Sequence, residues 1–270
     1  MILYGKPVAE KIYQEIKEEL KGGQIQPFLA VILVGEDKAS HSYVRVKEKK
    51  AEELGIKFEL YHFTTNSLSS QIIDQIQKLN ENPAVAGIIV QLPLPEGLDQ
   101  EKILQSISPQ KDTDGLNSEN PAPTAAAILK ILDYYNIDYK NLKMVIVGRG
   151  KLVGGPLEKM LTARGIEPLV CDSKTDNLTE ITSKADILIS ATGVPGLIKA
   201  DMVSEKAIVI DAGTAESKGE MKGDVDKEIY QKAKAYSPVP GGVGPLTVAM
   251  LMKNLVEAAN LSTLLEEKEK

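Results

Sequence analysis

Tyr43 and Lys47 are residues whose types and spacing could do chemistry. They stand four positions apart in a stretch, 40–54, that predicts a helix, so their side chains share one face. This helix follows a predicted strand, and α/β sheets bind ligands beyond the ends of their strands. A lysine partly removed from water there would have a lowered pKa and could exchange protons near neutral pH. On spacing alone, a solvated lysine beside a half-buried tyrosine is the more common arrangement.

A glycine-rich stretch offers a second kind of chemistry. A predicted strand over 143–147 runs directly into the sequence GRGKLVGGP at 148–156. Glycines at such a turn let the backbone approach a pyrophosphate, and the following helix supplies free N–H donors and a positive dipole. The spacing G-x-G-x-x-x-G is one residue longer than the usual dinucleotide fingerprint, so alone it also fits a tight turn without a ligand. Arg149 adds a cation beside the loop and favours a phosphate.

The residues after the next predicted strand bear on the choice of dinucleotide. Asp172 and Ser173 follow that strand, and Asp172 stands 24 positions after Gly148. An acidic residue there commonly bonds the ribose 2′-hydroxyl of NAD, whereas basic and hydroxyl groups accommodate the 2′-phosphate of NADP. Asp172 favours NAD, while Arg149, Ser173 and Lys174 favour NADP, so both cofactors stay open.

The composition narrows the class of protein. The net charge of −6 and the spread of basic residues argue against a nucleic-acid partner. We expect no membrane partner, because no run approaches the roughly 18 apolar residues of a membrane span and the N-terminus lacks a signal-peptide pattern. The single cysteine, Cys171, fits a reducing compartment such as the cytoplasm. Two histidines, His41 and His62, cannot supply a usual His/Cys cluster, so we expect no metal site.

Short apolar strands alternate with amphipathic helices in both halves of the chain, which is typical of parallel sheets with crossover helices. Between the halves, Pro109 to Pro123 shows no periodicity and is expected to be a linker, so two α/β lobes are joined near residue 120. In the first half we predict helices over 8–20, 40–54 and 68–79 and strands over 28–34, 57–63 and 85–91. In the second half we predict helices over 125–135, 156–164, 225–235 and 246–260 and strands over 143–147, 168–171, 186–190 and 207–211.

Five motifs stand in a fixed order along the chain. They are ASHSYVRVK at 39–47, GIIVQLPLP at 87–95, PQKDTDG at 109–115, GRGKLVGGP at 148–156 and SPVPGGVGPLT at 237–247. Together they closely resemble the methylenetetrahydrofolate dehydrogenase/cyclohydrolase family of the bacterial FolD type. The resemblance extends from about Gly5 to Ala259, and the stretches QLPLP and PVPGGVGP are highly specific.

The resemblance implies both an architecture and a reaction. The N-terminal α/β folate and catalytic domain would span 1–119, with helix 246–260 packing back on it, and a Rossmann-type NAD(P)-binding domain would span 120–245. The enzyme would oxidise 5,10-methylenetetrahydrofolate to 5,10-methenyltetrahydrofolate with NADP⁺, or alternatively NAD⁺, and hydrolyse the product to 10-formyltetrahydrofolate. These steps belong to one-carbon metabolism and purine biosynthesis. The resemblance also implies a cytoplasmic homodimer whose small-molecule partners are tetrahydrofolate derivatives.

The same resemblance assigns roles to residues. Lys47 would be the main catalytic group, needed above all for hydrolysis, and Gln91 would hydrogen-bond it. Tyr43 would stack on the aminobenzoate ring. Asp114 would bond the pterin nitrogens, since a carboxylate accepts two parallel N–H bonds. Further substrate-binding residues would be Pro238, Gly241 and Gly242. The cofactor-binding residues would be Gly148, Arg149, Gly150, Val153, Gly154, Asp172, Ser173 and Thr214.

The sequence departs from the family pattern at three places. Gly150 replaces a serine that would bind phosphate, Asp172 replaces a residue that is often histidine, and the segment 115–124 is shorter than usual. The charge of Asp172 would repel a 2′-phosphate, so we expect a weakened preference for NADP. Two alternatives are kept: a single-activity dehydrogenase and a non-catalytic folate- or nucleotide-binding protein. The intact catalytic set argues against both.

Overall fold

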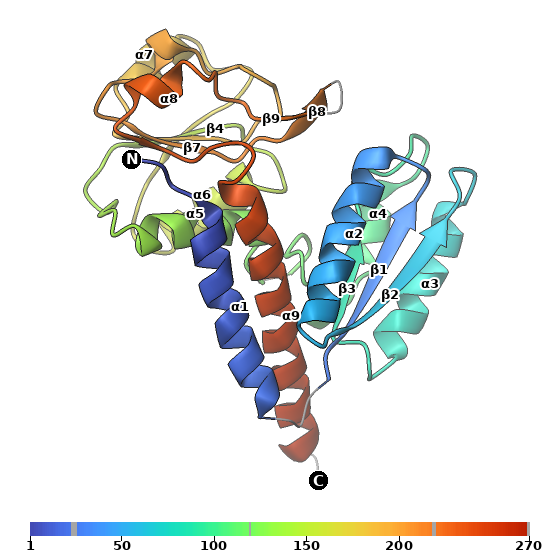
Figure 1. Cartoon of the computed structure of the whole chain (residues 1–270). Coiled ribbons are helices and arrows are strands. Elements are labelled where there is room, and N and C mark those ends of the chain that lie inside the picture. The colour runs from blue at the N-terminus through green and yellow to red at the C-terminus, as the bar shows by residue number, and fades with distance from the viewer. Residues whose placement is uncertain (23–25, 119, 218–219, 269–270) are drawn as a thin grey trace. The chain divides into compact units, whose positions relative to one another are not determined.

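The computed structural model describes residues 1–22, 26–118, 120–217 and 220–268. The chain forms two compact units, each with its own parallel sheet (Figure 1). The five-stranded unit comprises Met1–Lys11 and Pro121–Met250, and the three-stranded unit comprises Ile12–Asn120 and Leu251–Lys270. Strands and helices alternate along both, which confirms the expected two-lobed α/β fold class.

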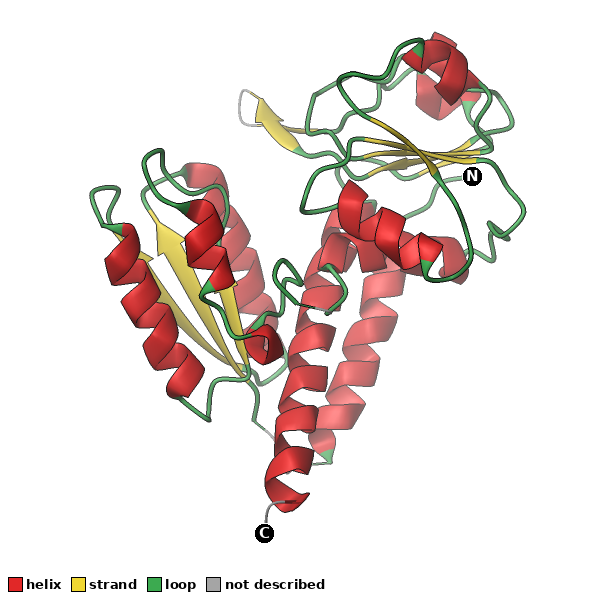
Figure 2. Cartoon of the chain, turned by 180° about the vertical axis from the view of Figure 1, so that it is seen from behind, coloured by secondary structure: helices red, strands yellow, loops and turns green. Residues whose placement is uncertain are grey.

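The three-stranded sheet has the order β2-β1-β3, with β1 at Phe28–Val34, β2 at Lys57–Phe63 and β3 at Gly87–Val90. All seven residues of β1 are buried, because the strand is central and covered on both faces. Helices α3 (Ser69–Glu81) and α4 (Gln100–Gln105) pack on one face through aliphatic side chains. Helix α2 (Lys38–Glu53) covers the other face, as the two opposite views in Figure 1 and Figure 2 show.

The carboxyl edge of this sheet carries the expected catalytic residues. Helix α2 begins after Asp37, whose carboxylate accepts a hydrogen bond of 2.7 Å from the N–H of Ser40 and caps the helix. Gln91 directly follows β3, and its backbone N–H donates to the carbonyl of Ile32 on β1 at 2.8 Å. Because β1 and β3 run parallel, the start of α2 and residue 91 lie at the same end of the sheet.

Of the segment expected to be a linker, residues 109–118 and 120–123 are described, and several of them are buried. It starts with a short 3-10 helix, η1, at Pro109–Lys111. Asp112 forms a parallel bridge with Ile88 of β3, and the buried Thr113 accepts a hydrogen bond of 3.0 Å from the Asn254 amide through its carbonyl. The chain passes from one unit to the other between Asn120 and Pro121, close to the expected position. The burial of Asp112 and Thr113 was not expected, because these contacts join positions far apart in the sequence, which local composition does not reveal.

The five-stranded sheet has the order β10-β7-β6-β4-β5, and all of its pairings are parallel. Strands β4, β6 and β7 are buried throughout. Helices α7 and α8 lie over one face and α5 and α6 over the other (Figure 1). The elements of this unit are α5 (Pro123–Tyr134), β4 (Met144–Val147), α6 (Gly154–Thr162), β5 (Leu169–Cys171), α7 (Leu178–Ser183), β6 (Ile187–Ser190), η2 (Ala200–Met202), β7 (Ile208–Asp211), α8 (Ile229–Lys232) and β10 (Ala235–Tyr236).

Two helices contribute residues to both units: α1 (Gly5–Lys21) and α9 (Val243–Lys268). Helix α9 is longer at both ends than the predicted stretch 246–260. Within the three-stranded unit, Lys253 of α9 lies 3.9 Å from Glu15 of α1, measured between Nζ and a carboxylate oxygen. No helix in the described part of the chain combines the length and apolar character needed to cross a membrane.

Two parts of the five-stranded unit differ from the prediction. The helix expected over 225–235 is reduced to α8, because Val225 instead pairs with Ile198 in a parallel bridge and Ala235–Tyr236 joins the sheet as β10 beside β7. An antiparallel pair, β8 (Ala215–Ser217) and β9 (Glu220–Lys222), was not predicted. Its strands of three residues are too short to give a periodic pattern.

Candidate active site

Lys47 and Gln91 form a direct hydrogen bond. The Nζ atom of Lys47 donates to Oε1 of Gln91 at 3.1 Å. Gln91 is only 9% exposed, and its Nε2 donates to the carbonyl of Leu92 at 2.7 Å, which turns the amide oxygen toward the lysine. A neutral amide oxygen stabilises an ammonium group less than a carboxylate would. The lysine therefore has a fixed position, and among the residues that the structure describes no carboxylate forms an ion pair with it.

Asp114 adds a carboxyl group to this pair. Burial raises the pKa of Asp114, while the positive charge of Lys47 acts in the opposite direction. Its place depends on Gly87, because a Cβ there would lie 2.5 Å from Cγ2 of the neighbouring residue Thr113. The close approach of Thr113 to β3 thus holds Asp114 beside the lysine. The structure brings Lys47, Gln91 and Asp114 into one group.

Tyr43 lies one helical turn before Lys47 on α2, and 39% of its surface is exposed. Four positions along a helix correspond to about one turn, so the ring and the ammonium group lie on the same side of α2. An exposed aromatic ring offers a flat apolar surface on which another ring can stack. Tyr43 therefore offers such a surface on the side of α2 that carries Lys47.

The glycine loop between β4 and α6 is shaped by close backbone contacts. Gly148 has a φ of 100°, and a Cβ on it would lie 2.5 Å from the carbonyl oxygen of Ala191. A Cβ on Gly154 would lie 1.8 Å from the carbonyl oxygen of Gly148. Neither position tolerates another residue without movement of the backbone. The loop, which ends at Val153 before the first turn of α6, therefore has the open backbone that a pyrophosphate requires.

Arg149 is engaged by Glu158, a residue that the sequence did not single out. Its Nε donates to Oε2 of Glu158 and its Nη2 donates to Oε1, both at 2.8 Å. The arginine side chain is 61% exposed and the glutamate 26% exposed. The cation of the loop is thus partly neutralised by the helix that follows, and no local pattern in the sequence reveals this pairing.

A buried carboxyl pair lies beneath the loops that follow β6 and β7. Asp211 accepts backbone N–H bonds from Gly213 and Asp224 at 3.1 Å, and burial raises the pKa of Asp211 to about 7. Asp224 accepts a bond of 2.7 Å from the backbone N–H of Thr192. The pair therefore fixes the loop after β6 and the loop that leads to the exposed Thr214.

The proline- and glycine-rich loop at 237–242 is bound to the start of α1. The N–H of Gly242 donates to the carbonyl of Pro238 at 2.7 Å, and the N–H of Gly5 donates to the carbonyl of Gly241 at 2.9 Å. A Cβ on Gly5 would lie 1.9 Å from the carbonyl oxygen of Gly242. The three residues expected to bind substrate here belong to the five-stranded unit, whereas Lys47 and its neighbours belong to the three-stranded unit.

Comparison with known proteins gives a consistent result. The model "Tetrahydrofolate dehydrogenase/cyclohydrolase, catalytic domain" matches residues 3–114, and the model "Tetrahydrofolate dehydrogenase/cyclohydrolase, NAD(P)-binding domain" matches residues 122–263. The chain belongs to the tetrahydrofolate dehydrogenase/cyclohydrolase family. The family expected from the five motifs is thereby confirmed, and with it the expected enzyme class, an NAD(P)-dependent dehydrogenase and cyclohydrolase of one-carbon metabolism.

Individual relatives of the family are similar over nearly the whole chain. The bifunctional protein FolD of Chlamydia caviae is 42% identical, over 97% of this chain and 100% of that protein. The crystal structure of the bifunctional enzyme FolD from Campylobacter jejuni is 40% identical with a TM-score of 0.92, over 97% of this chain and 99% of that one. The enzyme from Trypanosoma brucei, complexed with NADP cofactor and inhibitor, is 31% identical with a TM-score of 0.91, over 97% and 98%.

Gly150 and Asp172, the two departures from the family pattern near the nucleotide loop, differ in their surroundings. At Gly150 a Cβ would meet nothing within 4 Å, so space does not exclude the serine expected there from the family pattern. Asp172 is exposed, and its Oδ1 accepts a hydrogen bond of 2.9 Å from the N–H of Lys174. Thr175 adds a bond of 3.3 Å to the same oxygen, so the aspartate shapes the turn after β5 while placing a negative charge there. Ser173 lies exposed in the same turn.

Proposed function

We propose that this chain oxidises 5,10-methylenetetrahydrofolate with NADP⁺, or with NAD⁺ as the alternative, and then hydrolyses the methenyl product to 10-formyltetrahydrofolate. The observation that carries the proposal is the contact of 3.1 Å between Lys47 Nζ and Gln91 Oε1, with Asp114 beside it. A family member that only bound folate or nucleotide would have no evident use for a lysine held in this way.

Lys47 is proposed as the group that handles the proton in the hydrolytic step. As water adds to the methenyl carbon, a neutral amine takes one proton from the water and later gives it to the ring nitrogen whose bond to that carbon breaks. The hydroxyl left on the carbon loses its remaining proton to solvent as it becomes the formyl oxygen, so the step releases one proton overall. The substrate of this step is a cation, which favours the neutral amine nearby. Gln91 holds the amine in place through a hydrogen bond to its neutral amide oxygen.

Folate binding is proposed for Tyr43, Asp114 and the loop that contains Pro238, Gly241 and Gly242. The exposed ring of Tyr43 suits stacking on an aromatic ring of the substrate. The carboxyl group of Asp114 suits a pair of parallel N–H donors on a pterin. These roles rest on the family pattern together with the geometry of each residue.

The glycine loop fits a dinucleotide, because its close backbone contacts leave no side chain over the loop at Gly148 or Gly154. When bound there, the nicotinamide accepts a hydride. The residues that would hold it are Gly148, Arg149, Gly150, Val153, Gly154, Asp172, Ser173 and Thr214. Since Asp172 is negative and Arg149 is paired with Glu158, we propose that the preference for NADP⁺ over NAD⁺ is weaker than in relatives.

We also propose the domain roles and the assembly state. Residues 1–119, with helix 246–260 packing back on them, would form the folate and catalytic domain, and residues 120–245 the NAD(P)-binding domain. The protein would be a cytoplasmic homodimer. Light scattering of the purified protein tests the dimer, since a species at the chain mass of 29.3 kDa would contradict it.

One assay tests the activity. The purified protein is given methylenetetrahydrofolate with either cofactor, and methenyl absorbance and cofactor reduction are followed together. Reduction followed by rapid loss of the methenyl product supports both activities, whereas methenyl that decays at the uncatalysed rate would favour the single-activity dehydrogenase. No reduction with either cofactor would favour the binding protein. Lys47→Met should lose hydrolysis, and a full cyclohydrolase rate in that variant would refute its role.

A further inference from the structure

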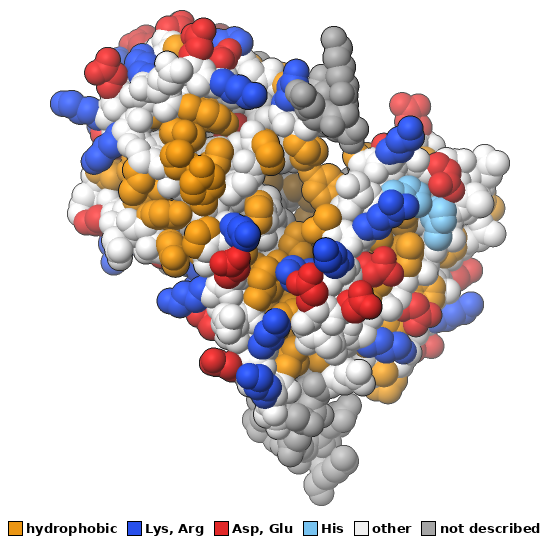
Figure 3. All heavy atoms as spheres, in the orientation of Figure 1, with side chains coloured by type: hydrophobic (Ala, Val, Ile, Leu, Met, Phe, Trp, Pro, Cys, Tyr) orange, Lys and Arg blue, Asp and Glu red, His pale blue; other side chains and the backbone are white. Residues whose placement is uncertain are grey.

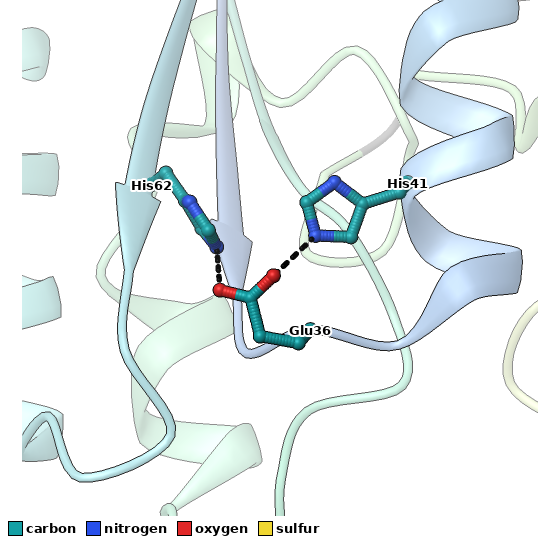
Figure 4. Close-up of side chains that lie close together, drawn as sticks. All are labelled: Glu36, His41 and His62. Carbon is teal, nitrogen blue, oxygen red and sulfur yellow. Dashed lines mark ion pairs between the residues drawn. The ribbon is translucent and has the colours of Figure 1, made fainter.

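Both histidines of the chain lie together with a glutamate at the carboxyl edge of the three-stranded sheet (Figure 4). Glu36 follows β1, His41 lies in the first turns of α2, and His62 is near the end of β2. The Nε2 atom of His41 is 3.3 Å from Oε2 of Glu36, and the Nε2 atom of His62 is 3.5 Å from Oε1 of the same carboxylate. One ligand atom from each residue lies within 4.8 Å of the others.

From this cluster we infer that Glu36, His41 and His62 form a binding site for a divalent transition-metal ion of the zinc class. Zinc binds imidazole nitrogen and carboxylate oxygen at 2.0–2.2 Å, so two ligand atoms of a tetrahedral site lie about 3.3 Å apart. The two imidazole nitrogens lie 3.3 and 3.5 Å from different oxygens of the Glu36 carboxylate, and one ligand atom from each residue lies within 4.8 Å of the others, so small side-chain movements bring three ligand atoms to this spacing. Three protein ligands of this kind leave the fourth position to water.

The surroundings of the His41 Nε2 atom suit a metal ligand. This atom is out of contact with solvent, and among the described residues its contact of 3.3 Å with Glu36 lacks the geometry of a hydrogen bond. Its charged neighbour Glu36 is 76% exposed, so it can adjust its carboxylate without disturbing the core. A buried nitrogen without a hydrogen bond is unfavourable, and a metal ion beside it would use its lone pair.

The sheet itself holds the second histidine in place. Strands β1 and β2 pair in parallel with Leu33 opposite His62, and the N–H of Gly35 donates to the carbonyl of Phe63 at 2.8 Å. The Nε2 of His62 lies 2.9 Å from the carbonyl of Gly35. Metal binding requires this nitrogen to be unprotonated, so its hydrogen moves to Nδ1 and the bond to Gly35 is exchanged for the metal. The rigid pairing of the strands means that only side chains need to move.

The ion can reach this cluster from solution. Figure 3 shows the histidine side chains as one patch on the surface of the molecule. The adjoining Asp37 is engaged as the cap of α2, but its carboxylate adds negative charge beside the cluster. Imidazole and carboxylate ligands suit zinc, whereas calcium and magnesium prefer ligand sets made of oxygen alone. The sequence did not predict this site because it holds few histidines and the contribution of Glu36 depends on the fold.

Titration of the purified chain with Zn²⁺, followed by calorimetry and by competition with a metallochromic chelator, tests the site. We expect one ion per chain at this cluster, and at least tenfold weaker binding in Glu36→Gln, His41→Gln and His62→Gln. The matched control, Glu52→Gln, removes the same charge from the far end of α2 and should bind as the parent does. Equal affinity in the parent and in all three cluster variants would overturn the proposal.

Substitution of Co²⁺ for Zn²⁺ gives a readout that does not depend on stability. Four-coordinate Co²⁺ with nitrogen and oxygen ligands absorbs in the visible region, and we expect this spectrum in the parent protein and its loss in Glu36→Gln, whose exposed side chain contributes little to folding. A spectrum unchanged from that of Co²⁺ in buffer would refute the site. The outcome is independent of the proposed enzyme activity, because none of the three residues belongs to the folate or nucleotide machinery.

Discussion

Arg149 in the glycine loop and Glu158 on the following helix are joined by two parallel hydrogen bonds of 2.8 Å each. Paired donors and acceptors of this kind fix the position of a guanidinium group and partly neutralise it. An incoming 2′-phosphate would therefore meet an arginine that already has an anionic partner, with Asp172 as a second negative charge in the turn after β5. Substitution of either carboxylate, Glu158 or Asp172, therefore tests what sets the preference between NADP⁺ and NAD⁺.

Glu158→Gln should improve the use of NADP⁺. The amide keeps the shape of the side chain and one acceptor oxygen, but it removes the negative charge beside Arg149. An interaction between exposed charges contributes up to about 1 kcal/mol, so removing the charge of Glu158 should lower KM for NADP⁺ by about fivefold. KM for NAD⁺, which has no 2′-phosphate, should stay the same and serves as the control. A rise in KM for NADP⁺ would mean that Glu158 instead positions the arginine for binding.

Asp172→Asn should raise kcat/KM for NADP⁺ by about tenfold, since it removes a charge that would repel the 2′-phosphate. Asparagine keeps an oxygen that can accept the hydrogen bond of 2.9 Å from the N–H of Lys174, so the turn is retained. The matched control is Asp176→Asn, an exposed aspartate of the same loop. An equal gain in kcat/KM for NADP⁺ in both variants would show that the effect comes from the reduced negative charge of the loop and not from the position of Asp172. A parent enzyme with a hundredfold preference for NADP⁺ would contradict the weakened preference itself.

Much of the fold could be predicted from the sequence, because it rests on local patterns. The run of apolar residues over 28–34 predicts β1 at its observed bounds, since a strand buried on both faces needs no polar side. The burial of Asp112 and Thr113 could not be predicted, because it depends on partners on β3 and α9 that are distant in the sequence. The short α8 differs from its predicted helix for a similar reason, since the pairing of β10 with β7 interrupts the helical pattern.

Some features of the candidate site could likewise be predicted from local sequence, whereas others depend on the fold. The glycine loop could be predicted because one short stretch contains both the strand end and the glycines. Lys47 and Gln91 are 44 positions apart, so their contact depends on the sheet, and the family resemblance supplied what spacing could not. Glu158 and the pair Asp211 and Asp224 gave no sign in the sequence, because a single acidic residue is usually a solvated one.

Gln91→Glu should shift the pH dependence of the hydrolytic step upward. A carboxylate 3.1 Å from Lys47 Nζ would stabilise the charged amine, so the fraction of neutral lysine at a given pH falls. We expect the cyclohydrolase profile to move by about one pH unit or more toward alkaline pH. Gln91→Met is the control, because it also loses the bond to the Leu92 carbonyl but adds no charge. A profile identical in the parent and in Gln91→Glu would argue that Lys47 does not handle the proton.

The buried Asp211 should make the protein less stable as the pH rises. Its pKa is raised to about 7 by burial, above the value of about 3.9 for an unfolded chain, so the folded state keeps a proton that the unfolded state releases. This contribution is present below about pH 4 and is lost progressively as the pH rises through about 7. Urea unfolding between pH 5 and pH 8 measures it.

The matched pair for this measurement is Asp211→Asn and Asp201→Asn. In Asp211→Asn the unfolding free energy should no longer decrease between pH 5 and pH 8 on account of residue 211. In Asp201→Asn, which changes an exposed aspartate, the pH dependence of the parent should be retained. Asp211→Asn should also be less stable overall, because its amide group cannot accept the N–H bond of 3.0 Å that Val225 donates to Oδ2. An unchanged pH slope in Asp211→Asn would show that another group carries the titration.

Gly87→Ala should weaken both the fold and the binding of folate. The added Cβ would lie 2.5 Å from Cγ2 of Thr113 and 2.6 Å from Cδ1 of Leu255, both on buried residues, so one of them must shift. Overpacking of this kind costs about 1–3 kcal/mol of unfolding free energy. Because Thr113 precedes Asp114, we expect KM for methylenetetrahydrofolate to rise while KM for the dinucleotide stays unchanged.

Two further variants test whether the contact with Thr113 causes the loss of stability and of folate binding in Gly87→Ala. Gly87→Ala combined with Thr113→Ser removes the methyl group in the closer contact and should recover part of the lost stability. Gly244→Ala, where a Cβ meets nothing within 4 Å, should change the unfolding free energy by less than about 1 kcal/mol. If Gly87→Ala raises KM for both substrates equally, the displacement reaches beyond Asp114. The pattern expected instead, a folate-specific loss with partial recovery by the smaller side chain, would tie the position of Asp114 to the packing of Thr113 against β3.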